Sequence, residues 1–130
     1  MNKILIHLLA WLPMIILAIF NALIREWIFL DLFTEKLSFQ LSTITLILIF
    51  TLYTWFISRR WPLESKKQAI IVGLAWCVLT IIFETALGFA GGQSTEELLA
   101  AYDLADGNLW ALVPVSLAVL PWVLFKFNNR

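Results

Sequence analysis

Cysteine and histidine are almost absent from this 130-residue sequence, in which Cys77 and His7 are the only residues of their kinds. A single cysteine cannot form an internal disulfide, so the cysteine content does not indicate a redox compartment. One histidine and one cysteine cannot supply the usual ligand set of a metal or haem site, nor a nucleophile, base and acid. A glycine-rich phosphate loop is also missing. We therefore expect no metal, no cofactor and no enzyme activity.

Charge is also scarce, since Asp, Glu, Lys and Arg make up only 14% of the chain while hydrophobic residues make up 62%. A typical soluble domain has about a quarter of its residues charged. A short chain buries only part of its surface on folding, so the apolar excess has to face lipid. No basic block with interleaved aromatic residues is present, which argues against nucleic acid as a partner.

Four apolar runs are present, at 4–24, 40–58, 68–89 and 108–125. About 20 helical residues cross a hydrocarbon core of ~30 Å, and all four runs approach or exceed this length. Backbone amides cannot stay unpaired in lipid, which favours helices. The sequence therefore predicts an all-α fold: one polytopic domain over residues 1–130, built as a left-handed four-helix transmembrane bundle.

The basic residues indicate how the chain crosses the membrane. Seven of the nine lie at the termini or between the second and third runs: Lys3, Arg59, Arg60, Lys66, Lys67, Lys126 and Arg130. Basic residues favour the cytoplasmic side. We expect a multi-pass protein of the inner (plasma) membrane with both termini in the cytoplasm, and with the first and third connections outside.

The third connection predicts a short amphipathic helix at 95–105. Ser94 and Glu97 have the spacing of a capping box, in which each side chain accepts a hydrogen bond from the other residue's backbone amide. Leu98, Leu99 and Tyr102 follow at helical spacing on one face. This helix is interpreted either as a lid over the end of the bundle or as a gate for a solute.

The first connection is unusually apolar over residues 27–33. These residues either continue the first helix, lie flat among lipid headgroups, or contact a partner protein. Ser38 or Thr34 is expected to cap the second span, because hydroxyl side chains accept hydrogen bonds from free backbone amides.

Stripes of small or polar side chains run along three of the spans. They are Gly73, Cys77, Thr80, Glu84 and Gly88; Ala18, Asn21 and Arg25; and Gln40, Thr43, Ile47, Thr51, Thr54 and Ser58. Such stripes are typical of close helix packing in lipid and indicate the interior of the bundle. In the fourth span, Pro114 and Pro121 predict kinks, which either leave a cavity or improve the fit.

Glu84 is the residue that most strongly indicates a site, since a carboxylate in hydrocarbon costs several kcal/mol. Arg25 and Asn21 lie near the outer end of the first span, and Gln40 begins the second span at a similar depth. A guanidinium can bind a carboxylate through two hydrogen bonds, so an ion pair between Glu84 and Arg25 is expected. Asn21 and Gln40 would complete this polar cluster, and Tyr102 and Asp103 would reach it from the 95–105 helix.

Two hypotheses follow for this cluster. In the first, it binds or transports a small polar solute or ion, with Glu84 as the titrating group, and a second copy of the chain completes the pathway. In the second, the ion pair only fixes helix register, and the protein is a structural subunit that docks on a larger membrane complex through residues 27–33.

The sequence also resembles a set of small bacterial four-span membrane proteins to which no activity is assigned. The resemblance lies in Phe83-Glu84 with Gly88, in Glu97-Leu98-Leu99 with Tyr102-Asp103, and in Gly107 with Leu109-Trp110. Asn21 with Arg25-Glu26 and the run Gln40-Leu41-Ser42-Thr43 belong to the same pattern. It covers most of the chain and implies no substrate.

Overall fold

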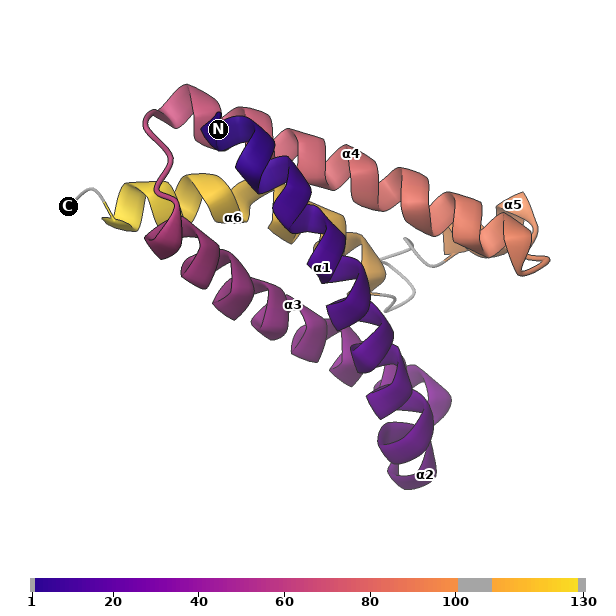
Figure 1. The fold of residues 1–130 in the computed structure, drawn as a ribbon. Helices are drawn as coiled ribbons and strands as arrows, with labels where there is room; N and C mark the ends of the chain where they lie inside the picture. The colour runs from indigo at the N-terminus through magenta and orange to yellow at the C-terminus, as the bar shows by residue number, and fades with distance from the viewer. Residues whose placement is uncertain (1, 101–108, 129–130) are drawn as a thin grey trace.

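The computed structural model describes residues 2–100 and 109–128 and is built from four long helical segments (Figure 1). The described elements are α1 (Lys3–Ile24), η1 (Arg25–Phe29), α2 (Leu30–Leu32), α3 (Glu35–Arg60), α4 (Lys66–Ala90), α5 (Thr95–Ala100), η3 (Leu109–Ala111) and α6 (Leu112–Asn128). No strand occurs within the described ranges. Four helical stretches, at Lys3–Leu32, Glu35–Arg60, Lys66–Ala90 and Leu109–Phe127, are long and apolar enough to cross a membrane.

The helices extend beyond the predicted spans because polar side chains cap them earlier. Asn2 accepts a hydrogen bond from the Ile4 amide, Thr34 from the Leu37 amide and Ser65 from the Gln68 amide. The second helix therefore begins at Glu35 rather than at residue 40, with Thr34 as its cap. Ser38, the alternative cap, is buried inside that helix.

The first helix continues past residue 24 through a π-helical turn, η1, and then α2. The Leu30 amide bonds to the Arg25 carbonyl, five residues back, which is the hydrogen bond that defines a π-turn. Residues 27–32 therefore continue the first helix, as one of the three expectations for this segment proposed.

The described part of the predicted 95–105 helix is α5, which spans Thr95–Ala100, and the remainder lies outside the described residues. The capping box is confirmed: the Glu97 amide lies 3.2 Å from the Ser94 hydroxyl, and the Ser94 amide lies 3.3 Å from a Glu97 carboxylate oxygen. Leu98 packs over Gly88 of α4, which places α5 against the end of that helix.

The helices pack in the order α1, α3, α6, α4 around the bundle, with α4 and α6 in the most extensive contact. Gly73 makes this contact close, since a Cβ at this position would lie 2.1 Å from the carbonyl oxygen of Ala118 on α6. The interior position expected for Gly73 is therefore confirmed, and its function is close backbone approach.

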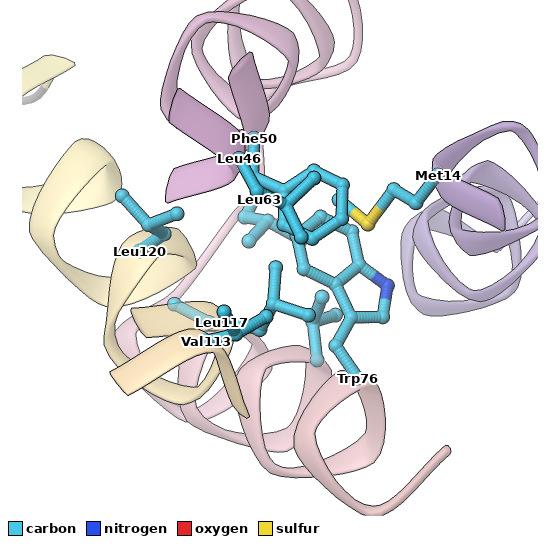
Figure 2. Close-up of a cluster of buried hydrophobic side chains, with 10 residues drawn as sticks. Met14, Leu46, Phe50, Leu63, Trp76, Val113, Leu117 and Leu120 are labelled. Carbon is cyan, nitrogen blue, oxygen red and sulfur yellow. The ribbon is translucent and has the colours of Figure 1, made fainter. Parts of the chain in front are cut away.

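The core of the bundle is formed by side chains from all four long helices and the α3–α4 loop (Figure 2). Its buried members are Met14, Leu46, Phe50, Leu63, Ala69, Val72, Trp76, Val113, Leu117 and Leu120. Trp76 is fully buried and its indole nitrogen donates to the His7 carbonyl at 2.8 Å. Trp76 is thus a core residue that pins α1 to α4, and not an anchor at the membrane surface.

The prolines of the fourth helix differ in their effect. Pro121 lies inside α6 and is fully buried, whereas Pro114 falls in the first turn, after the short 3-10 turn η3. Proline is tolerated in a first helical turn because the missing amide has no helical partner there. Pro114 therefore gives no reason for the kink that the sequence predicted at this position.

The two ends of the bundle differ in content (Figure 1). One end holds the start of α1, the α3–α4 loop and the end of α6, and is called the terminal end. The opposite end holds α2 and α5, and is called the Arg25 end. α1 and α4 separate towards the Arg25 end, where α2 and α5 lie far apart in the view.

Candidate functional site

A cavity of about 560 Å³ lies between α1, α3, α4 and η3 on the Arg25 side of the core, and we call it the Glu84 cavity. Its size falls in the range of small-molecule binding sites. Most of its lining side chains are apolar. The polar and charged side chains of its wall are Asn21, Arg25, Lys36, Gln40, Thr43, Thr80, Glu84, Thr85 and Gln93.

Four of the six predicted site residues, Asn21, Arg25, Gln40 and Glu84, line this one cavity. They come from three different helices, so their convergence is a property of the fold and not of the sequence spacing alone. Tyr102 and Asp103, the other two, lie outside the described residues.

Glu84 is half-buried on α4 and accepts a hydrogen bond from the indole nitrogen of Trp110, at 2.7 Å. Trp110 belongs to η3, the turn that precedes α6. A short hydrogen bond to a carboxylate is stronger than one between neutral groups. An indole N–H therefore stabilises the carboxylate without adding a positive charge to the cavity.

Arg25 is the first residue of the π-turn and its side chain is 16% exposed. Its Nε atom lies 3.7 Å from a carboxylate oxygen of Glu26, and its guanidinium carbon lies 4.3 Å from the centre of the Phe39 ring. The Arg25 Nε is buried and makes no hydrogen bond to any described residue. π-turns are common at functional sites, and this one sets the place of Arg25 in the cavity wall.

The predicted ion pair between Glu84 and Arg25 is not shown. Within the described ranges the one salt bridge is that between Arg25 and Glu26, and the Glu26 side chain is 53% exposed. The contact found at Glu84 comes instead from Trp110. Direct pairing of Glu84 with Arg25 stays a prediction.

Asn21 is 1% exposed and ties α1 to α3. Its amide nitrogen donates to the backbone carbonyl of Ser42 at 3.0 Å and to the Ser42 hydroxyl at 2.8 Å. Because a carbonyl can only accept, the nitrogen has to face Ser42, and this fixes the orientation of the amide. The Oδ1 atom of Asn21 is then buried with no hydrogen-bond partner among the described residues.

The deep end of the cavity is apolar and closed. Met14, Leu46 and Phe50 belong both to the cavity wall and to the buried core. On the α1–α4 side, the indole nitrogen of Trp11 donates to the Thr80 hydroxyl at 3.0 Å, and its ring meets Phe83 edge-on. These contacts end the cavity within the bundle.

Sequence reasoning missed Trp110, Ser42 and Trp11 as partners of the polar wall. Tryptophans near the ends of membrane spans are commonly interfacial anchors. Trp27 and Trp55 are exposed, as anchors would be, but Trp11 and Trp110 line the cavity. The depth of Trp110, at the start of the span facing Glu84, is the signal from which the contact could have been inferred.

His7 lies far from this site, in the terminal half of α1. Its Nδ1 is 2.9 Å from the Lys3 carbonyl, and its ring stacks against Trp76. His7 is thus held by a backbone hydrogen bond and a ring contact. No group of three metal-ligating side chains occurs within the described part of the chain.

Comparison with known proteins adds no assignment to this geometry, since no protein-family model, no curated protein and no solved structure matches the chain.

Proposed function

We propose that this chain is a multi-pass membrane protein that binds a small solute carrying a polar group in the Glu84 cavity, as a component of solute transport. The observation that carries the proposal is the convergence of Glu84, Arg25, Asn21 and Gln40, from three helices, on one cavity of ligand size. Ionisable groups in membrane spans are costly and mark binding or transport sites.

The proposed topology rests on the surface and the charges of the bundle. Large apolar side chains on its outside are widely exposed, including Ile16, Leu48 and Ile82, as expected where lipid is the solvent. Lys and Arg concentrate at the terminal end, which we assign to the cytoplasmic side of the plasma membrane. The Glu84 cavity then lies in the outer half of the membrane.

Binding, rather than passage through one rigid chain, fits the closed floor of the cavity. Since Met14, Leu46 and Phe50 are buried, a solute could cross only if the helices moved or a second copy completed the path. We therefore propose that transport uses a homo-oligomer or a larger complex.

The test compares two substitutions in the same helix, α1. Ala22→Phe fills the cavity from α1, whereas Ile16→Phe adds a ring at a position that is 69% exposed and outside the cavity. Protein purified from its own membranes should retain a bound small molecule in native mass spectrometry. The wild type and Ile16→Phe should keep it, and Ala22→Phe should lose it at unchanged helicity. If all three proteins retained the molecule equally, it would be lipid bound to the outer surface and not a ligand of the cavity. That result would refute the proposal.

The exposed apolar surface of the π-turn and α2 favours a second function, docking on a larger membrane complex. Trp27 is 70% exposed and Leu32 is 69% exposed, beside Glu26 and Asp31. A Trp27→Ala/Leu32→Ala variant should lose co-purifying proteins while keeping its cavity ligand. If no protein co-purifies with the wild type under mild detergent, the docking function fails.

A further inference from the structure

The Glu84 cavity has a side wall that faces the membrane. Two residues that line it, Ile19 on α1 and Leu87 on α4, are 54% and 60% exposed on the outside of the bundle. Ile19 lies well inside a segment long enough to cross a membrane, and Leu87 lies in the last turn of another. A side chain that lines a cavity and is also exposed marks the edge of an opening, so the cavity opens sideways between α1 and α4.

The arrangement of the two helices explains this opening. Hydrogen bonds and a ring contact join α1 to α4 at His7 with Trp76 and at Trp11 with Thr80 and Phe83. Towards the Arg25 end the two helices separate (Figure 1). Small residues also line this part of the wall: Ala22 on α1, Gly88 on α4, and Gly91 just after α4.

The inside of the cavity matches a molecule with two unlike ends. Its deep part is lined by Met14, Ile15, Leu46, Phe50 and Phe83, which offer no charged group and suit an apolar chain. Its shallow part holds Arg25, Lys36 and Gln40. An opening that faces lipid and an apolar floor would admit most lipids. They disfavour a fully hydrated solute, because such a solute would have to lose its water on binding.

The charges of the shallow part indicate the polar end of the ligand. Arg25 and Lys36 are cationic, and Glu84, the one carboxylate among the described residues of the wall, accepts a hydrogen bond from Trp110. The buried Arg25 Nε has no hydrogen-bond acceptor among the described residues, and a guanidinium binds carboxylate or phosphate well. The buried Asn21 Oδ1 requires a donor, since its amide nitrogen is held by Ser42.

Building on the proposed function, we infer that the ligand is a single-chain amphiphile that enters sideways from the membrane. Its head carries an anionic carboxylate or phosphate for Arg25 and Lys36, and a hydroxyl or amine that donates to Asn21 Oδ1. Its chain lies along Met14, Leu46 and Phe50.

The experiment titrates three probes into the protein in lipid nanodiscs. The first is a lysophosphatidic acid, which has a phosphate, a free hydroxyl and one acyl chain. The second is glycerol phosphate, which keeps the head without the chain. The third is a lysophosphatidylcholine of the same chain length, which keeps the chain and screens the phosphate with a choline cation.

The lysophosphatidic acid should bind at least about ten-fold tighter than either of the others. Arg25→Gln should weaken the binding of lysophosphatidic acid roughly ten-fold, which is the effect of losing one charged hydrogen bond. The same variant should bind lysophosphatidylcholine with unchanged affinity. Arg59→Gln is the matched control, because Arg59 lies outside the cavity wall at the other end of α3.

The outcomes separate this inference from the proposed function. Tighter binding of glycerol phosphate than of the acylated probe would overturn sideways entry but support a polar-solute site. Equal affinities for the two acylated probes would overturn the inference of an anionic head. An equal loss of lysophosphatidic acid affinity in Arg25→Gln and Arg59→Gln would also overturn it. If the Ala22→Phe variant binds the lysophosphatidic acid as the wild type does, the cavity is not the site and both proposals fail.

Discussion

Trp110 donates to Glu84 across the contact between η3 and α4, with 2.7 Å between the indole nitrogen and the carboxylate oxygen. The acid is thus held by a neutral donor from the segment that leads into the last helix. This hydrogen bond joins residues 26 positions apart and fixes one wall of the cavity. The side chains of the facing wall, Asn21 and Arg25, are held separately by Ser42 and by Glu26 and Phe39.

Replacing Trp110 by phenylalanine should destabilise the fold by about 1–3 kcal/mol, because a partly buried carboxylate loses a donor. Thermal unfolding in detergent measures this loss. Trp27→Phe is the matched control, since Trp27 is 70% exposed and should have almost no effect. Equal shifts for the two variants would show that the Trp110 hydrogen bond does not contribute to stability.

Glu84→Gln distinguishes a binding role from a structural one. If Glu84 serves ligand binding, the variant should keep its cellular abundance while affinity for the cavity ligand falls. If the carboxylate is structural, abundance should fall instead. If Glu84 also pairs with Arg25, the double variant with Arg25→Gln should be milder than either single one, as a double-mutant cycle would show.

Asn21→Leu should cost more stability than Ser42→Ala. The first change removes both hydrogen bonds that Asn21 donates to Ser42, including the one to the Ser42 carbonyl. The second removes only the hydroxyl, so the bond to the carbonyl remains. We expect a difference of about 1 kcal/mol in the free energy of unfolding, measured by denaturant titration in mixed micelles. The opposite order would mean that the Ser42 hydroxyl has an additional role.

Gly73→Ala should strongly destabilise the contact between α4 and α6. Its Cβ would meet the backbone of Ala118, which cannot move without separating the helices, at a cost of roughly 1–3 kcal/mol or more. Gly88→Ala is the comparison, because there the Cβ would meet the side-chain ends of Leu98 and Gln93, which can rotate away. A thermal shift for Gly88→Ala as large as that for Gly73→Ala would contradict this account.

The number and type of the helices could be predicted because apolar length is a strong signal. The interior positions of Gly73, Thr80 and Asn21 followed from helical spacing. Helix starts were less accurate, since Thr34 and Ser65 cap their helices several residues before the apolar runs begin. The side of the membrane for each end is a prediction from the basic residues alone.

Depth along the membrane was easier to predict than rotation about a helix axis. Glu84, Arg25, Asn21 and Gln40 were placed at a similar depth, and they do line one cavity. Which of them touch depends on how each helix is rotated, and packing decides this: Asn21 faces Ser42, and Glu84 faces Trp110. The π-turn at Arg25 adds a change of register that no periodicity in the sequence indicated.

The hydrogen bonds at Asn21 and Glu84 join the helices of the Arg25 end into two pairs, which we call arms. Asn21 with Ser42 fastens α1 to α3, and Trp110 with Glu84 fastens the start of the last helix to α4. The Glu84 cavity lies between these arms, and Trp11 with Thr80 lies where they meet. A change in cavity width that keeps both of these bonds would have to occur between the two helix pairs, where α3 also packs against η3 and α6.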